Sequence, residues 1–140
     1  MNLVKIKSYA KINLSLNITG KLKKLHKIES IVSFIDLYDL IFIKKINSLK
    51  HRISFYGKFS KNITSENTIS KLLDILDKNK LLNNQKFQIK VKKNIPQQAG
   101  LGGGSMNTAN IISFLNKKNF LKINQKQKIE ISNLVGRMLF

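Results

Sequence analysis

The 140-residue sequence contains no cysteine and no tryptophan, and it has a single proline. The lack of cysteine excludes disulfide bonds and thiolate metal sites, and it fits a reducing compartment. The chain also lacks a run of about 18 apolar residues, and the residues at 1–5 lack the apolar core of a signal peptide. We therefore expect a cytoplasmic protein with no membrane partner. The length is typical of one domain, which we place over residues 1–140.

Acidic residues are scarce: seven Asp and Glu stand against 26 Lys and Arg, which leaves a net charge of +19. Such an excess can indicate a nucleic-acid-binding protein. Arginine, which nucleic-acid surfaces favour for bidentate and stacking contacts, occurs only at Arg52 and Arg137. Lysine, asparagine and isoleucine, which have AT-rich codons, are abundant, so we attribute the charge to genome composition. We expect attraction of anionic ligands such as nucleotides, and no specific nucleic-acid partner.

Four of the seven glycines lie in one segment, residues 100–104, just ahead of an apolar helical pattern that includes Ile111, Ile112 and Leu115. Bare N–H groups at a helix start form an electropositive cup that suits phosphate. A flexible turn or an ordinary helix start is the alternative. The segment reads Pro-Gln-Gln-Ala-Gly-Leu-Gly-Gly-Gly-Ser-Met-Asn over 96–107. It matches neither the Walker A motif nor the dinucleotide fingerprint, and no protein-kinase signature follows it.

The N-terminal third has the pattern of β-strands. Apolar and polar residues alternate from Ala10 to Thr19, which predicts a half-buried strand with Lys11 and Asn13 on one face. The pattern then predicts a basic loop at Lys21–Lys24, extended segments at about 28–35, 40–43 and 52–56, and a turn at Asp36–Asp39.

Helical patterns appear in the second half. Ser65–Asn67 can cap a helix whose apolar stripe runs from Ile69 to Leu76. A strand at 87–91 then leads into the glycine-rich segment and the helix after it. Asn124 and Gln127 have the spacing of a reciprocal cap for a last helix at about 125–134. Strands first and mixed elements later predict an α+β fold.

Four further motifs accompany the glycine-rich segment, at residues 9–14, 18–20, 24–28 and 34–39. They read Tyr-Ala-Lys-Ile-Asn-Leu, Ile-Thr-Gly, Lys-Leu-His-Lys-Ile and Phe-Ile-Asp-Leu-Tyr-Asp. Together the motifs resemble the GHMP small-molecule kinases, and among them the 4-diphosphocytidyl-2-C-methyl-D-erythritol kinases, from about Lys7 to Gly136. The resemblance implies the N-terminal domain of that family, which is similar to the second domain of ribosomal protein S5. The family's ferredoxin-like C-terminal domain has no counterpart in this sequence.

The resemblance also implies the site residues. Lys11 would be the catalytic cation, Asn13 and His26 would bind the substrate, and the Ser105 hydroxyl would reach a phosphate or Mg²⁺. A helix N-cap is the alternative role for Ser105, and His51 is interpreted as an ordinary surface histidine. The ATP phosphates would be bound by Pro96, Gln97, Gln98, Ala99, Gly100, Leu101, Gly102, Gly103, Gly104, Ser105 and Met106.

Some positions depart from the family pattern. Leu25 stands where the family has a tyrosine, Gln97 and Gln98 replace Met-Gly, and Met106 replaces a second serine. Met138 stands where the family has the aspartate that activates the acceptor hydroxyl, and it cannot take a proton. Loss of one base from codons for Gly-Ser-Asp-Val-Ile-Leu-Gly would produce Gly-Arg-Met-Leu-Phe and a stop, as in residues 136–140. We therefore expect a frameshifted or truncated form with little or no turnover.

The implied reaction is the transfer of phosphate from ATP to the 2-hydroxyl of 4-diphosphocytidyl-2-C-methyl-D-erythritol, in isoprenoid precursor synthesis. A basic RNA-binding module with an S5-like fold is one alternative. Another GHMP kinase, for homoserine or mevalonate, is a second alternative, although the triple glycine before Ser105 argues against it.

Overall fold

The computed structural model describes residues 2–22, 25–97 and 103–137, with side chains at 2–11, 35–97 and 104–136. Its elements are β1 (Val4–Leu22), β2 (Leu25–Ile46), β3 (Arg52–Tyr56), α1 (Thr68–Lys78), β4 (Lys86–Lys92), α2 (Gly103–Lys117) and α3 (Gln125–Arg137). In this described part of the chain, no helix is long and apolar enough to cross a membrane.

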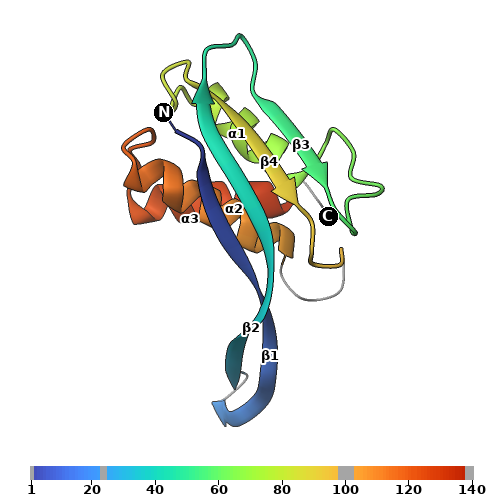
Figure 1. Cartoon of the computed structure of the whole chain (residues 1–140). Helices are drawn as coiled ribbons and strands as arrows, with labels where there is room; N and C mark the ends of the chain where they lie inside the picture. The colour runs from blue at the N-terminus through green and yellow to red at the C-terminus, as the bar shows by residue number, and fades with distance from the viewer. Residues whose placement is uncertain (1, 23–24, 98–102, 138–140) are drawn as a thin grey trace.

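The four strands form one mixed sheet in the spatial order β1–β2–β4–β3 (Figure 1). β1 pairs antiparallel with β2, β2 pairs antiparallel with β4, and β3 pairs parallel with β4. The chain reaches β4 from β3 through α1, because parallel neighbours need a crossover. β4 therefore lies inside the sheet, and the glycine-rich segment follows directly from an interior strand.

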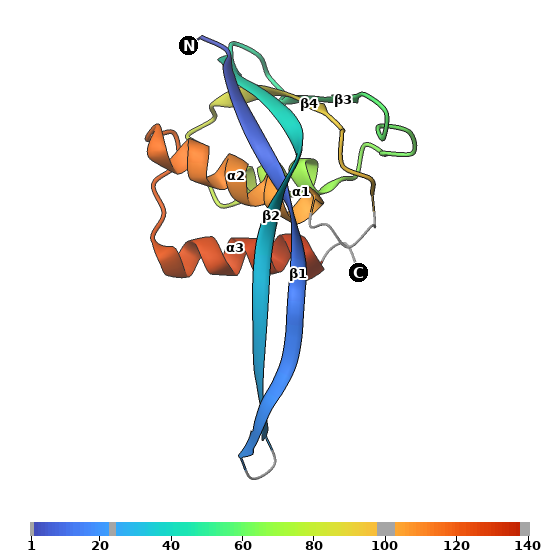
Figure 2. The ribbon, with the colours of Figure 1, turned by 60° about the horizontal axis from the view of Figure 1, so that its bottom comes forward.

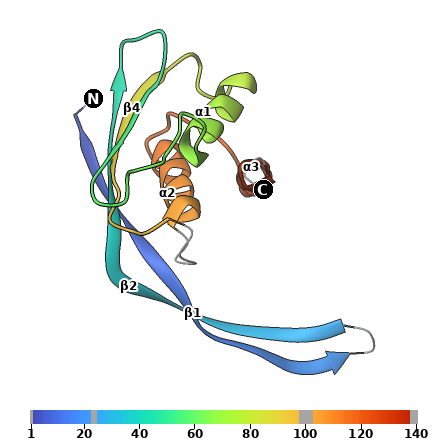
Figure 3. The same cartoon turned by 90° about the vertical axis from the view of Figure 1, so that its right-hand side faces the viewer.

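All three helices lie on one side of the sheet (Figure 3). α2 packs against β1 and β2, and α3 packs against α1 and α2. Figure 2 shows α3 farther from the strands than the other two helices. The core between sheet and helices is apolar, and burial of each large side chain contributes roughly 2 kcal/mol. Its fully buried members include Ile41, Ile43, Leu72, Leu76, Phe87, Ile89, Ile111, Ile112 and Leu115.

Local capping signals set the helix ends as the sequence predicts. Asn67 is the N-cap of α1: its side chain accepts from the N–H groups of Ile69 and Ser70, and the Ser70 hydroxyl accepts from the Asn67 N–H. At α3, the side chains of Asn124 and Gln127 accept from each other's backbone N–H groups at 2.8 and 2.9 Å. Because these bonds join near neighbours in the sequence, the sequence alone reveals them.

The predicted turn at Asp36–Asp39 is wrong, because β2 runs through it without reversing. Tyr38 pairs with Tyr9 and Phe34 pairs with Lys11, so residues 35–37 of β2 lie opposite the single residue Ala10. Extra residues in one strand bend a β-ribbon. Beyond this irregularity the β1–β2 hairpin curves away from the sheet and extends past the helices (Figures 2 and 3).

The predicted basic loop at Lys21–Lys24 also differs from the structure. β1 continues to Leu22, and Lys21 and Leu22 pair with His26 and Leu25 of β2. Residues 23 and 24 lie outside the described part. Strand pairing therefore persists almost to the end of the hairpin, because each strand supplies the hydrogen-bond partners that the other needs.

Candidate functional site

The glycine-rich loop joins the interior strand β4 to α2. Its first stem, residues 93–97, follows β4, and α2 begins at Gly103. Gln98, Ala99, Gly100, Leu101 and Gly102 lie outside the described residues. The structure therefore places the two ends of the predicted ATP-binding segment, Pro96–Gln97 and Gly103–Met106, and these ends belong to one loop.

The first turn of α2 is open to solvent. Gly104 and Ser105 are exposed, and Met106 is half-buried. A Cβ added at Gly104 would lie 3.6 Å from Thr68 Cγ2, an ordinary van der Waals contact. The protein itself therefore leaves room for a side chain there, and the bare backbone remains accessible to a ligand.

Ser105 is the third residue of α2, so the N-cap alternative for it is wrong. The N-cap residue precedes the first helical residue, which here is Gly103. Within the described residues the Ser105 hydroxyl makes no recorded hydrogen bond. Its position is that of an exposed hydroxyl in the first turn of a helix, where the macrodipole favours anions.

The first stem is held on its outer side by the loop after β3. The Lys93 N–H donates to Tyr56 O at 2.7 Å, and the Phe59 N–H donates to Lys93 O at 3.2 Å. Farther along the stem, the Gln97 amide donates to Phe59 O and Lys61 O at 3.0 and 3.1 Å. A methionine, which the family pattern has at this position, could not donate these bonds.

Asp39 holds the same stem from its inner side, and sequence reasoning missed it. Its carboxylate is fully buried. Oδ1 accepts from the N–H groups of Asn94 and Ile95 at 2.7 and 2.9 Å. Oδ2 accepts from Lys93 Nζ and, at 2.9 Å, from Asn107 Nδ2. The only sequence signal is its place in the 34–39 motif, which overlaps the segment predicted to be a turn.

Asn107 brings α2 into the same cluster. A carboxylate only accepts hydrogen bonds, so the Asn107 NH₂ group must face Asp39 and the amide oxygen must face away. Asn107 is 2% exposed, and its Oδ1 is buried with no recorded partner within the described part of the chain. One turn later, Asn110 Nδ2 donates to Ser8 Oγ at 2.9 Å and joins α2 to β1.

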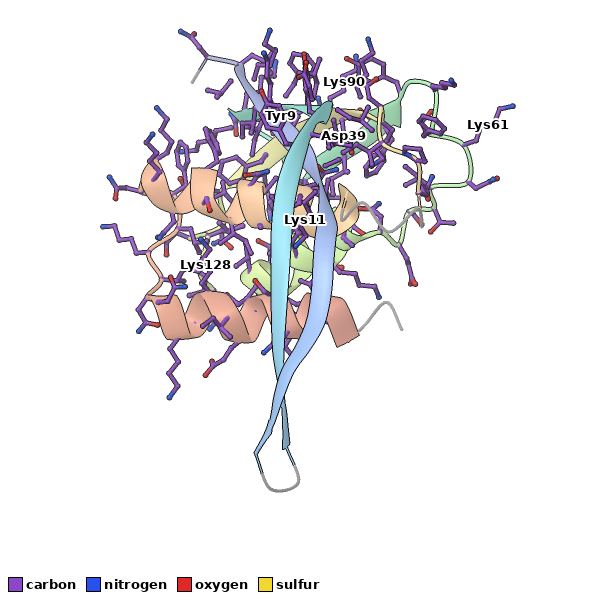
Figure 4. The ribbon with its side chains drawn as sticks, turned by 90° about the horizontal axis from the view of Figure 1, so that it is seen from below. Tyr9, Lys11, Asp39, Lys61, Lys90 and Lys128 are labelled. Atoms are coloured by element: carbon purple, nitrogen blue, oxygen red, sulfur yellow. The ribbon has the colours of Figure 1, made fainter. Side chains whose placement is uncertain are left out.

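Lys11, the predicted catalytic cation, is exposed on β1 directly after the buried Ala10. Because side chains alternate along a strand, it leaves β1 on the face opposite to Ala10. Figure 4 shows Lys11 and Asp39 on the neighbouring strands β1 and β2, where the hairpin leaves the sheet. No ion pair or hydrogen bond of its side chain is recorded among the described residues, so its catalytic role stays a prediction.

The two predicted substrate-binding residues lie on the hairpin. Asn13 pairs with Val32, and His26 pairs with Lys21 close to the hairpin's end. Both side chains lie outside the described set. His26 is eight residues beyond Phe34, the partner of Lys11, so about 26 Å of extended strand separates the two levels. The structure therefore keeps Lys11 and His26 on one ribbon but does not bring them together.

His51 is a structural residue, which corrects its interpretation as an ordinary surface histidine. Nδ1 accepts from the Phe87 N–H at 3.0 Å, and Nε2 lies 2.9 Å from Asp77 Oδ2. The neutral Nε2–H tautomer satisfies both contacts. Burial lowers the pKa of His51 below 6.5, although the adjacent Asp77 acts in the opposite direction.

Neither metal clusters nor cavities indicate another site. Within residues 2–22, 25–97 and 103–137, no three His, Asp or Glu side chains gather as a metal site. A shallow cavity of about 560 Å³ lies between the β2–β3 and α1–β4 loops, lined by residues such as Lys45, Asn84 and Lys86. None of the predicted site residues lines it.

Comparison with known proteins gives the family. Residues 67–139, more than half of the chain and including the glycine-rich loop, match the model of the GHMP kinases N terminal domain. The chain belongs to the GHMP kinases. The α+β fold predicted from the sequence is that of the GHMP N-terminal domain, and this prediction is confirmed.

Individual relatives agree with the GHMP assignment. The chain is 60% identical to the 4-diphosphocytidyl-2-C-methyl-D-erythritol kinase of Pelagibacter ubique (strain HTCC1062), over 97% of this chain and 48% of the relative. It resembles a crystal structure of 4-(cytidine 5'-diphospho)-2C-methyl-D-erythritol kinase with a TM-score of 0.65 and 19% identity, over 94% of this chain and 46% of that one. The crystal structure of the Methanococcus jannaschii mevalonate kinase resembles it with a TM-score of 0.62 and 16% identity, over 99% of this chain and 47% of that one.

These comparisons confirm the resemblance predicted from the motifs. They also show that this GHMP kinase chain spans about half the length of the curated relatives it matches. The structural likenesses, at 19% identity or less, establish the fold alone.

Proposed function

We propose that this chain, as one domain over residues 1–140, is the ATP-binding half of a 4-diphosphocytidyl-2-C-methyl-D-erythritol kinase. The reaction would transfer the γ-phosphate of ATP to the 2-hydroxyl of that substrate, in isoprenoid precursor synthesis. The observation that carries the proposal is the 60% identity, over 97% of the chain, to a kinase of that name. We also assign the protein to the cytoplasm, where ATP is available.

The geometry of the loop supports ATP as the donor. The loop leaves an interior strand and enters a helix whose first turn is exposed, so its N–H groups and the helix dipole favour phosphate. In our proposal residues 96–106 surround the phosphates, and Gly103 and Gly104 permit close approach of the backbone. A net charge of +19 assists the approach of any nucleotide.

Mg²⁺ would enter with the nucleotide. The protein offers the Ser105 hydroxyl as one hard oxygen ligand, which fits an ion held mainly by substrate phosphates and water. A bound Mg²⁺ would supply neutralisation of the negative charge on the triphosphate. Ser105 would orient that phosphate end relative to α2.

Lys11 and the hairpin would receive the acceptor substrate. Phosphoryl transfer depends on position and on stabilisation of charge more than on covalent chemistry. An exposed lysine without a recorded ion pair in the described residues can supply charge to the transferring phosphate. We assign Asn13 to the acceptor's hydroxyl groups and His26 to its cytidine end, because the substrate is elongated and the two residues lie at different levels of one ribbon.

Binding of a fluorescent ATP analogue to the 140-residue chain tests the donor. We expect saturable binding that ATP reverses, together with a higher unfolding temperature in ATP and Mg²⁺. Absence of both at millimolar nucleotide would contradict the assignment of the loop.

The acceptor is tested by thermal shift with 4-diphosphocytidyl-2-C-methyl-D-erythritol, homoserine and mevalonate in parallel. A shift with the first compound alone, lost in His26→Ala, is the expected result. A higher unfolding temperature with homoserine or mevalonate instead would indicate that the chain is a GHMP kinase for that substrate.

A further inference from the structure

We propose that Asp39 is the positioning residue of the glycine-rich loop, because one buried carboxylate binds both ends of that loop. This inference deepens the proposed function and rests on it, since the loop's assigned ligand is the triphosphate of ATP. Both carboxylate oxygens of Asp39 are occupied by groups at the two ends of the loop, so Asp39 acts on the ligand only through the loop.

The four donors to Asp39 lie on opposite sides of the loop in sequence. Lys93, Asn94 and Ile95 directly precede Pro96, and Asn107 directly follows Met106. The loop between these contacts has 11 residues, 96–106. Fixing the two ends of such a segment to one point removes much of its conformational freedom before a ligand binds. A ligand then meets a preorganised loop instead of ordering a free one.

The charge arrangement fits this role. Lys93 is 5% exposed, and its ammonium group is paired with Asp39. Burial makes the pair intolerant of the loss of either partner, because an unpaired buried charge is costly. The pair therefore holds the first stem beside β2 and leaves Oδ2 able to accept from α2 as well.

Asn107 extends the constraint from the first stem to α2. Its NH₂ is committed to Asp39, which fixes the plane of the amide and the direction of the unpartnered Oδ1. Asp39 therefore orients the Asn107 side chain at the start of α2, directly after the loop.

The control is Asp77, whose carboxylate also joins several elements but whose side chain is 29% exposed, whereas that of Asp39 is fully buried. Its carboxylate also joins three elements, because it contacts His51 ahead of β3 and Lys86 at the start of β4 from its own position on α1. It lies at the other end of β4 from the loop stem. Asp39→Asn and Asp77→Asn each remove one charge and one acceptor, so they separate loss of stability from loss of loop order.

Hydrogen exchange on the full chain, without nucleotide, is the first measurement. In Asp39→Asn we expect exchange to accelerate about tenfold at the Asn94 and Ile95 amides and in the first turn of α2, beyond any change elsewhere. Asp77→Asn should leave those amides at their original rates. Uniform acceleration over the whole chain in Asp39→Asn would overturn the proposal.

Affinity for the fluorescent ATP analogue, measured well below both unfolding temperatures, is the second readout. Asp39→Asn should weaken binding by about tenfold, and Asp77→Asn should stay close to the original chain. Equal effects of the two variants would overturn the proposal. If the unsubstituted chain binds no nucleotide, the proposed function fails, but the exchange measurement still decides whether Asp39 orders the loop.

Asn107→Ala covers the case in which Asp39→Asn does not fold, because it removes one bond and keeps the Asp39–Lys93 pair. We expect faster exchange in the first turn of α2 and unchanged exchange at Asn94 and Ile95. Unchanged exchange at both places would show that Asp39 does not constrain the second end of the loop.

Discussion

Asp39 on β2 and Asn107 on α2 are 68 residues apart in the chain, and a hydrogen bond of 2.9 Å joins their side chains. Asn110, one turn along α2, makes a bond of the same length to Ser8, which pairs with Asp39 in the sheet. Two adjacent sheet residues therefore fix the start of α2. These contacts therefore also determine where the exposed first turn, with Gly104 and Ser105, lies relative to the sheet.

Gly104→Ala tests whether the bare backbone of this turn serves a ligand. The added methyl group meets Thr68 at an ordinary contact distance, and alanine favours a helix over glycine by up to about 1 kcal/mol. We expect equal or higher thermal stability but about tenfold weaker nucleotide binding, because the Cβ occupies space that phosphate needs. Calorimetric unfolding and nucleotide titration measure the two effects.

Gly136→Ala is the control for that substitution. Gly136 lies in α3 with open space around it, so the variant should gain stability without a change in nucleotide affinity. If the two variants bound nucleotide equally well, close backbone approach at Gly104 would have no part in binding.

Lys11→Ala tests the proposed catalytic cation. Because Lys11 is exposed, stability should change by less than about 0.5 kcal/mol. We expect loss of the response to ATP together with 4-diphosphocytidyl-2-C-methyl-D-erythritol, measured as the thermal shift of the ternary mixture. Lys5→Ala removes the same charge from an exposed position on the same strand and should retain the response. Indistinguishable behaviour of the two variants would reduce Lys11 to an ordinary surface lysine.

The lowered pKa of His51 predicts a pH dependence of stability. In the unfolded chain the imidazole takes up a proton at its ordinary pKa of 6.5, whereas burial in the folded protein delays protonation to lower pH. The contribution of His51 is therefore complete above pH 6.5 and declines as pH falls toward its folded-state pKa. Urea unfolding between about pH 7.5 and 5 should show this decline, and His51→Gln should flatten it. Parallel curves for the two proteins would exclude His51 as the source.

Polyanion binding separates the kinase assignment from the RNA-binding alternative. On the sheet face away from the helices, Lys7 lies over the Tyr38 ring and Lys90 over the Tyr56 ring, each at 5.1 Å. We expect this face to bind single-stranded RNA without sequence preference at low salt, and to lose at least about tenfold in affinity between about 50 and 200 mM salt. Filter binding measures both. Sequence-selective binding that persists near physiological salt would favour an RNA-binding module.

The sequence predicts well the features whose causes are local. The alternation at 52–56 and 87–91 and the capping residues Asn67 and Asn124 depend on neighbours within a few positions, and the structure places them as expected. The order of strands in the sheet and the clustering of distant side chains depend on partners that periodicity does not reveal.

Two of the wrong predictions, those for Asp39 and His51, have one physical cause. Asp39 resembled a turn residue because aspartate is common in turns, but its partners lie 54 to 68 residues away and make it a buried acceptor. His51 resembled a surface histidine because its partners Asp77 and Phe87 are 26 and 36 residues away in sequence. Both residues satisfy backbone or side-chain donors of remote elements, and no local pattern marks such a role.

The irregularity opposite Ala10 divides the chain into regions that tolerate length changes differently. Between it and the hairpin's end, β1 has one extra residue at each of two further irregularities, after Asn13 and after Ile18, and the stretches between them are paired residue by residue. Deletion of one codon in such a stretch would turn the side chains that follow to the opposite surface of the ribbon as far as the next irregularity. Asp39 fixes the segment between Ile95 and Asn107 at both ends, so gain or loss of a codon there would change the length of a loop that spans two fixed points. Over evolutionary time, insertions and deletions should therefore accumulate at the irregularities of the hairpin sooner than in its regularly paired stretches or in the glycine-rich loop.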